Sequence, residues 1–297
     1  MATIISPGRA AELHAAVIEA CNQMGVDPFG AELIKYTVNA VYTLSAPIVV
    51  RVGSGGIGHY RGARLIETAD WLTKHDAPTI RLVEGQQPVC VGDFTVTFWH
   101  KVHRRVRWTA SDLAQPLRAL HQLPTDDADL PGWDPFETAR HRLAAADSGI
   151  SGDDLQWLRD AWFEAEQNYR TADFSLPFAV IHGDPHIGNL LVDNRDRIVL
   201  CDLDESGIGP MAWDLVPQAV GATRFDRADF YRDFAAAYGV DVRDLPEWPV
   251  LARIRELIMV TSVLPDLGQR PGIAAEQAHR LASLRSRDAA SVWHPYQ

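Results

Sequence analysis

The chain has 297 residues, of which 46% are hydrophobic and 23% are charged, a composition typical of soluble globular proteins. Its formal charge of −11 argues against nucleic-acid binding, which requires a cationic surface. No apolar run is long enough to span a membrane, and the first residues lack the pattern of a secretory signal. Three widely spaced cysteines argue against a zinc site and favour a reducing compartment, so we expect a cytoplasmic protein.

Local patterns in the first hundred residues predict a small lobe made mainly of antiparallel strands. Ser6-Pro7 and Gly25 delimit an amphipathic helix over residues 8–24. The strands that we expect next, with a helix before the third, cover residues 36–44, 48–52, 79–83, 88–91 and 94–99. We therefore predict an N-terminal lobe over residues 1–99 and a hinge over residues 100–103.

Helical patterns dominate the rest of the chain and predict a larger C-terminal lobe over residues 104–297. The expected helices cover residues 109–122, 136–146, 152–170, 211–222, 226–238, 248–264 and 273–292. Pro116 lies inside the first of them and should kink it or delay its start. The sequence has no internal repeat, and its overall pattern predicts an α+β fold.

Two short apolar runs within the helical region end in polar residues. The first leads into His182-Gly-Asp184 and reaches Asn189, and the second leads into Asp202 and Asp204. Carboxylate and amide oxygens at strand ends could hold a hard divalent cation. One carboxylate could also accept the proton of an attacking hydroxyl, as phosphoryl transfer requires.

These residues resemble the motifs of the aminoglycoside phosphotransferase and choline kinase family. The similarity extends from about residue 178 to residue 216 and ends with the run Gly209–Leu215. It implies a two-lobed protein-kinase-like fold, with a small, mainly antiparallel β N-lobe and a larger helical C-lobe. It also implies ATP or GTP as the phosphoryl donor and Mg²⁺ as the metal.

The resemblance assigns a role to each residue of the motif. Asp184 would be the catalytic aspartate facing the acceptor hydroxyl, and Asn189 and Asp202 would be the magnesium ligands. Asp214 would be the buried aspartate that supports the catalytic loop, in which His182 would pack.

Kinase-like folds also use a strand lysine that contacts the phosphates and is held by a helix glutamate. Arg51 takes the place of that lysine here, and Glu67 on the following helix is its expected partner. An arginine binds phosphate with planar fork geometry, which differs from the compact ammonium of lysine. A surface ion pair with no role in phosphate binding remains the alternative.

The remaining nucleotide contacts are expected from the first strands and the hinge. Asn39 is the candidate in the phosphate-covering loop, around residues 37–42, which contains no glycine. The backbone groups of His100, Lys101 and Val102 would line the adenine pocket if the hinge is correctly placed.

Three alternatives remain open from the residues alone. The run Gly53–Gly58 matches the dinucleotide pattern G-x-G-x-x-G, and an NAD(P)-dependent oxidoreductase built on it is one of them. His182, Asp184 and His186 could instead be ligands of a metal-dependent phosphohydrolase. A catalytically silent nucleotide-binding pseudokinase is the third.

The acceptor is expected to be a small molecule with a hydroxyl group. The negative charge of the chain, and of Asp204 and Glu205 behind the metal ligand, would attract a cation such as an aminoglycoside or another antibiotic. The sequence distinguishes neither resistance from biosynthesis or salvage, nor ATP from GTP, and gives no oligomeric state.

Overall fold

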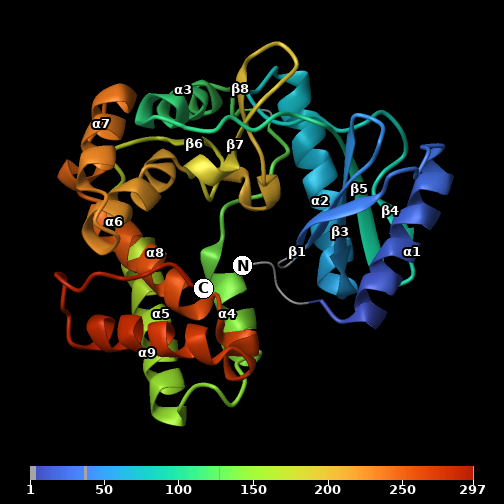
Figure 1. The fold of residues 1–297 in the computed structure, drawn as a ribbon. Helices are drawn as coiled ribbons and strands as arrows, with labels where there is room; N and C mark the ends of the chain where they lie inside the picture. The colour runs from blue at the N-terminus through green and yellow to red at the C-terminus, as the bar shows by residue number, and fades with distance from the viewer. Residues whose placement is uncertain (1–4, 37–38, 127, 297) are drawn as a thin grey trace. The chain divides into compact units, whose positions relative to one another are not determined.

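The computed structural model describes residues 5–36, 39–126 and 128–296, without the side chains of 56–61, 266 and 269. The chain divides into two compact units, coloured by residue number in Figure 1. The N-terminal unit comprises Met1–Arg107, Asp126–Pro131 and Gly188–Ser206, and the helical unit comprises Trp108–Thr125, Gly132–Ile187 and Gly207–Gln297. The division into lobes 1–99 and 104–297 with a hinge at 100–103 stays a prediction.

The N-terminal unit contains a five-stranded antiparallel sheet with the strand order β1-β2-β3-β5-β4. Its strands are β1 Glu32–Tyr36, β2 Ala40–Thr43, β3 Ile48–Ser54, β4 Val89–Val91 and β5 Phe94–His100. The predicted β4–β5 hairpin is confirmed. The single strand predicted over residues 36–44 is wrong, because β1 ends at Tyr36 and a separate strand, β2, which pairs with it, covers Ala40–Thr43. The strand predicted over residues 79–83 is also wrong, because Thr79 and Leu82 form only isolated bridges.

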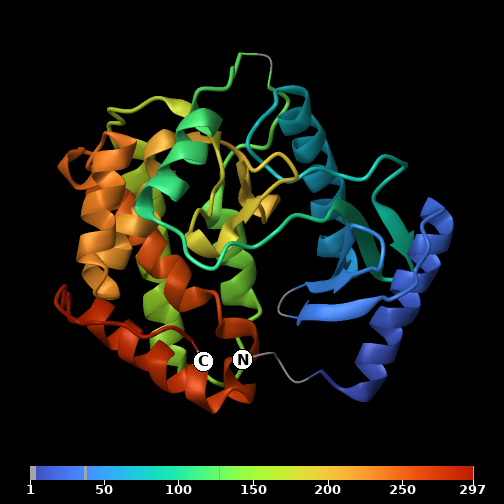
Figure 2. The same cartoon turned by 45° about the horizontal axis from the view of Figure 1, so that its top comes forward.

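Two helices pack on opposite faces of this sheet, α1 Pro7–Met24 and α2 Gly55–Lys74 (Figure 2). The alternation of side chains along a strand explains how the faces are divided. Val96 and Phe98 of β5 belong to the hydrophobic core that α1 covers. Thr95 points to the other face, where a Cβ added at Gly62 of α2 would lie 2.4 Å from its methyl carbon. The absence of a side chain at Gly62 therefore permits close packing of α2 on the sheet.

A second, small hairpin belongs to the N-terminal unit and carries two of the expected site residues. Strands β7 Leu190–Val192 and β8 Ile198–Leu200 pair antiparallel. Hydrogen bonds of 2.8 Å from Leu200 N to Pro78 O and of 3.0 Å from Ile80 N to Leu200 O attach β8 to the segment after α2. Residues predicted as part of the sheet thus hold this hairpin instead.

The helical unit contains helices and a two-stranded antiparallel sheet, β6 Phe178–Ile181 and β9 Gly207–Pro210. Its α-helices are α3 Ala110–His121, α4 Pro135–Ala144, α5 Gly152–Thr171, α6 Val216–Arg224, α7 Ala228–Tyr238, α8 Trp248–Thr261 and α9 Pro271–Arg285. The short 3-10 helices are η1 Ile187–Asn189, at the boundary of the two units, η2 Leu203–Glu205 of the N-terminal unit, and η3 Met211–Asp214, η4 Val242–Asp244 and η5 Leu264–Gln269. The mixed α+β fold predicted from the sequence is confirmed.

Capping residues explain the predicted boundaries of some helices. The Ser6 hydroxyl accepts a hydrogen bond from Arg9 N at the start of α1, and Gly25 ends that helix with φ +67°. Thr109 and Asp112 form a capping box at the start of α3, so Pro116 does not delay it. The last helix is shorter than predicted and ends at Arg285. Among the described helices, none combines the length and apolar character needed to cross a membrane.

Candidate active site

The loop after β6 presents Asp184 from a buried strand of the helical unit. His182 is fully buried, and its Nδ1 accepts a hydrogen bond of 3.3 Å from Asp184 N. Gly183 has φ +89°, a backbone conformation that L residues with a side chain rarely adopt. The chain therefore bends at Gly183 and Asp184, directly after the strand, and the Asp184 carboxylate is partly exposed.

The fully buried carboxylate of Asp214 holds the backbone of this loop through hydrogen bonds. Its Oδ2 accepts a hydrogen bond of 2.7 Å from His182 N, and its Oδ1 accepts one of 2.8 Å from Gly183 N. His121 Nε2 lies 2.9 Å from Oδ2, and His121 Nδ1 lies 2.7 Å from the Tyr238 hydroxyl. Hydrogen bonds to backbone N–H groups and a histidine satisfy a charge that would otherwise be costly to bury.

Two further side chains fix the carbonyl groups of the loop. Trp213 Nε1 donates to Gly183 O at 2.7 Å, and Gln218 Nε2 donates to Pro185 O at 2.7 Å. Both donors are buried and follow β9 along the chain. Because both N–H and carbonyl groups of the loop have hydrogen-bond partners, the backbone that carries Asp184 is held in one conformation within this unit.

The Asp184 carboxylate has a cationic partner that the sequence analysis missed. Arg255 Nη1 of α8 lies 2.8 Å from Asp184 Oδ1. Burial alone would raise the pKa of the Asp184 carboxyl, but Arg255, with His186 and His182, lowers this pKa below its ordinary value. The carboxylate is therefore negatively charged throughout the neutral pH range.

Sequence reasoning could have noticed Arg255 only as a charged residue in an unusually apolar helix. The neighbouring Ile254 and Leu257 are fully buried, so an arginine between them must lie at the edge of the core. Its partner is far away in the sequence, and no local spacing rule connects the two residues.

In the N-terminal unit, the β7–β8 hairpin brings Asn189 and Asp202 to the same end. Cys201 N donates to Asn189 O at 2.9 Å, and Leu190 pairs with Leu200. Asp202 follows directly, with an exposed side chain and φ +67°. A non-glycine residue held in this conformation is strained, and such strain often marks a functional position.

The donor set at this hairpin end suits magnesium. Within the described part of the chain, the Asp202 carboxylate forms no hydrogen bond or ion pair, so it is available to a cation. Magnesium is commonly bound by one or two protein oxygens, with phosphates and waters supplying the remaining ligands. No group of three or more His, Cys, Asp or Glu side chains suited to a metal occurs among the described residues.

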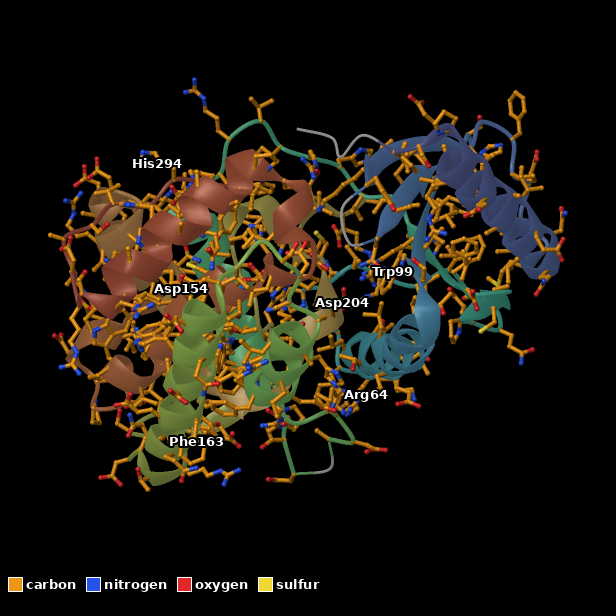
Figure 3. All side chains as sticks on the ribbon, turned by 90° about the horizontal axis from the view of Figure 1, so that it is seen from below. Arg64, Trp99, Asp154, Phe163, Asp204 and His294 are labelled. Atoms are coloured by element: carbon orange, nitrogen blue, oxygen red, sulfur yellow. The ribbon has the colours of Figure 1, made fainter. Side chains whose placement is uncertain are left out.

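Arg51 lies on the face of the sheet that α2 covers, because it alternates with Val50 and Val52 of the opposite core. Its guanidinium group pairs with Asp204 of η2, a segment that packs against α2. Asp204 is labelled in Figure 3. The expected Arg51–Glu67 pair is therefore wrong. Glu67 is exposed, whereas its neighbours Ile66 and Thr68 on α2 are buried.

Asn39 stands at the start of β2, beside the end of β3. Its Oδ1 would lie 3.3 Å from a Cβ at Gly53, so the glycine provides the space that this amide occupies. The neighbouring Thr37 and Val38, also expected in the phosphate loop, lie outside the described residues.

Two of the three expected adenine contacts already use their backbone N–H groups. His100 ends β5, and its N–H donates to Arg81 O at 2.9 Å, while Lys101 N–H donates to Pro47 O at 2.8 Å. Val102 follows them, and among the described residues its backbone groups form no hydrogen bond. Val102 is therefore the residue of this segment whose backbone N–H and carbonyl groups are both available to an adenine ring.

The glycine-rich run does not form a dinucleotide site. Gly53 and Ser54 end β3, and Gly55, with φ +81°, begins α2. A dinucleotide fold places this turn between parallel strands, whereas both sheet neighbours of β3 run antiparallel to it. The oxidoreductase alternative is therefore wrong.

The two residues expected to attract a cationic acceptor differ in their surroundings. The Asp204 charge is compensated by Arg51, and Glu205 is exposed beside it. Arg51 therefore offsets the negative charge of one of the two expected acceptor contacts.

The chain matches the model of the phosphotransferase enzyme family (APH) over residues 37–257, which is more than half of its length. The protein therefore belongs to this family, and the resemblance to aminoglycoside phosphotransferases and choline kinases is confirmed. No curated protein sequence matches the chain.

Solved structures share the fold at low sequence identity. An amicoumacin kinase, hAmiN, in complex with AMP-PNP, Ca²⁺ and Ami, has a TM-score of 0.69 and 14% identity, covering 96% of this chain and 98% of that one. A choline/ethanolamine kinase family protein from Mesorhizobium loti has a TM-score of 0.64 and 17% identity, with coverages of 93% and 94%. The aminoglycoside phosphotransferase APH(3'')-Id from Streptomyces rimosus has a TM-score of 0.58 and 19% identity, with coverages of 83% and 98%. The protein-kinase-like fold is thereby established.

Proposed function

We propose that this protein transfers the γ-phosphoryl group of ATP or GTP to a hydroxyl group of a small molecule. The observation that carries the proposal is the position of Asp184 on a loop whose backbone is held by the buried Asp214. Membership of the phosphotransferase family supports the reaction type. The bound AMP-PNP and Ca²⁺ of the amicoumacin kinase support a nucleotide and a divalent cation.

In the proposed reaction, the acceptor oxygen forms a bond to the γ-phosphorus while the bond to the β–γ bridging oxygen breaks. Asp184 orients the acceptor hydroxyl and receives its proton late in the transfer. A carboxylate of low pKa is a weak base, so its main contribution is orientation and electrostatic stabilisation.

The nucleotide would be bound by residues of the N-terminal unit. Asn189 and Asp202 would hold Mg²⁺, which when bound supplies positive charge against the phosphates. Arg51 would exchange the Asp204 carboxylate for a phosphate oxygen, because a guanidinium group binds both in fork geometry. Asn39 and the backbone of Val102 would complete the contacts.

The acceptor is proposed only as a small molecule with a hydroxyl group, for which Asp204 and Glu205 remain candidate contacts. The ligands and names of the structural neighbours include amicoumacin, aminoglycosides and choline or ethanolamine. Because these compounds differ chemically, a screen of acceptors is required to identify the substrate.

The first experiment measures the melting temperature with ATP, GTP, NAD and NADP, each with and without magnesium. A ligand that binds only the folded state raises the melting temperature by mass action. We expect a magnesium-dependent rise with ATP or GTP, followed by nucleotide consumption that Asp184→Asn abolishes while nucleotide binding persists. Binding without consumption by any tested acceptor would favour the pseudokinase alternative, and near-normal turnover by Asp184→Asn would contradict the assignment.

A further inference from the structure

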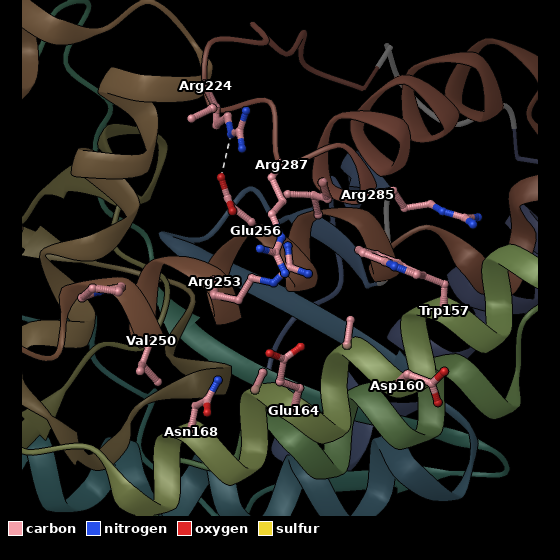
Figure 4. A pocket seen from close by; sticks show the side chains of 15 residues that line it. Trp157, Asp160, Glu164, Asn168, Arg224, Val250, Arg253, Glu256, Arg285 and Arg287 are labelled. Atoms are coloured by element: carbon pink, nitrogen blue, oxygen red, sulfur yellow. Dashed lines mark hydrogen bonds and ion pairs between the residues drawn. The ribbon is translucent and has the colours of Figure 1, made fainter.

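A pocket of about 760 Å³ lies in the helical unit, lined by one side of α8 (Figure 4). Its walls come from α5, α8, the end of α6 and the residues around the end of α9. Arg253 and Glu256 of α8 line it, whereas Arg255 contacts Asp184. Residues two positions apart on a helix point about 200° apart, so the two arginines serve different sites.

Most of the charged groups on the pocket wall have partners. Arg224 Nε donates to Glu256 Oε1 at 2.6 Å, the dashed contact in Figure 4, and its Nη1 donates to Asp288 O at 2.7 Å. Arg285 pairs with Asp154, outside the pocket wall, and Asp160 Oδ1 accepts from Gln156 at 2.9 Å. The remaining charged side chains of the pocket wall are those of Arg253, Arg287 and Glu164.

Arg253 and Arg287 point toward one another in the pocket (Figure 4). Within the described residues, neither guanidinium group has a hydrogen-bond or ion-pair partner. Trp157 lies beneath Arg253, with the guanidinium carbon 5.4 Å from the ring centroid. Burial, together with the neighbouring Arg287 and Arg224, lowers the pKa of Arg253, although Glu256 and Glu164 act in the opposite direction.

Two unpaired guanidinium groups that face each other repel, and the half-buried one has lost part of its hydration. An oxyanion between them would remove both costs by accepting charge-assisted hydrogen bonds from the two forks. The contact with the indole of Trp157 limits the conformations of the Arg253 side chain, so this side chain loses less entropy when an anion binds. Glu164, exposed on the α5 wall, would oppose an anion but forms no ion pair that neutralises either arginine.

We propose that this pocket is a binding site for a small oxyanion, a phosphate or carboxylate group, held between Arg253 and Arg287. The site is separate from the proposed phosphoryl-transfer site and does not depend on its assignment.

The test is titration calorimetry at low ionic strength, with inorganic phosphate and acetate as probes and without magnesium or nucleotide. The protein carries Arg51→Gln, so that the proposed nucleotide site does not contribute phosphate binding. We expect Arg253→Gln to weaken binding about tenfold or more and the Arg253→Gln/Arg287→Gln double variant to abolish it. Glu164→Gln should strengthen binding, because it removes a repelling carboxylate.

Arg159→Gln is the matched control, since it removes an exposed positive charge of α5 that does not line the pocket. Its affinity should stay within about twofold of the parent protein, as expected for an unspecific change of net charge. Arg287 is exposed, so Arg287→Gln alone tests the site even if the Arg253 variant folds poorly.

A preference for phosphate would assign phosphate-bearing ligands, and a preference for acetate would assign carboxylates. Both results support the oxyanion site. The proposal is overturned if neither probe binds at millimolar concentration, or if the double variant binds as tightly as the protein with both arginines.

Discussion

Arg255 of α8 forms an ion pair of 2.8 Å with Asp184, the carboxylate at which we place the acceptor hydroxyl. The pair holds the pKa of Asp184 below the ordinary value of 3.8 against the effect of burial. A group whose pKa is lower in the folded state stabilises the fold above its unfolded pKa. This contribution is lost as the pH falls through the lowered folded pKa. The pair therefore favours both a charged base and a folded protein at neutral pH.

Replacing Arg255 should move the acidic limit of activity to higher pH. In Arg255→Gln, the pKa of Asp184 rises because the leading cation is gone and burial remains. We expect nucleotide consumption to decline at a higher pH than in the wild-type protein. The pH profile of turnover, measured with an acceptor found by screening, tests this expectation.

Arg232→Gln provides the control for this pH profile, because Arg232 is an exposed residue of α7 whose ion pairs, within the described residues, are with acidic neighbours on its own helix. Its profile should match that of the wild-type protein. An unchanged acidic limit in Arg255→Gln would show that Arg255 does not control the charge of Asp184.

Removing the Asp214 carboxylate should destabilise the protein and inactivate it together. Asp214→Ala leaves two buried backbone N–H groups and His121 without their acceptor. The expected loss is on the order of 3–5 kcal/mol in the free energy of unfolding. Urea denaturation measures it, and Tyr238→Phe, which removes only the outer hydrogen bond to His121, should cost about 1 kcal/mol. Equal losses for the two variants would contradict the supporting role of Asp214.

The features predicted correctly from the sequence depend on local signals. Helix α1 is set by Ser6, Pro7 and Gly25, all of which act within one turn of its ends. The β4–β5 hairpin is set by a two-residue turn that includes Gly92, with φ +55°. The loop around Asp184 was recognised because its residues lie close together in the sequence.

The features that the sequence did not reveal depend on distant contacts. The segment 79–83 reads as a strand, yet its backbone bonds partly to Leu200 of the β7–β8 hairpin. Arg51 pairs with Asp204 rather than with Glu67, because the register of α2 on the sheet leaves Glu67 exposed. Such pairings are decided by how elements pack, and no spacing in one sequence encodes them.

Gly183 should tolerate no side chain. Its φ of +89° strains an L residue, so Gly183→Ala should lower stability by about 1–3 kcal/mol and displace the adjacent Asp184. Gly152 is the control, because it begins α5 without a positive φ, and a Cβ there would meet nothing within 4 Å. Gly152→Ala should be neutral or slightly stabilising. Full turnover by Gly183→Ala would show that the loop can adopt another active conformation.

The Arg51–Asp204 pair should compete with nucleotide binding. If Arg51 exchanges Asp204 for a phosphate oxygen, Asp204→Asn removes the competitor and should strengthen ADP binding about threefold to tenfold. Arg51→Gln should weaken ADP binding by about tenfold or more. Calorimetry with ADP gives both values, and weaker binding by Asp204→Asn would instead show that Asp204 supports the nucleotide site.

Substitution of Asp202 should affect the stability of the fold and the binding of magnesium in opposite directions. Asp202 has φ +67°, so Asp202→Gly relieves the backbone and should stabilise the fold by about 1 kcal/mol, offset in part by the flexibility of glycine in the unfolded chain. The same variant lacks the proposed magnesium ligand. We expect its melting temperature without ligand to be maintained or raised, while the magnesium-dependent rise with ATP disappears.

Asp196 provides a matched control on the same β7–β8 hairpin, since it has φ +58° and lies at the turn, away from the end that carries Asn189. Asp196→Gly should change stability in the same direction and keep the magnesium-dependent rise. Asp202→Asn completes the series, because it retains a residue that tolerates this conformation and removes only the negative charge. If Asp202→Gly and Asp202→Asn both keep the full magnesium effect, then Asp202 is not a ligand and its strain requires another explanation.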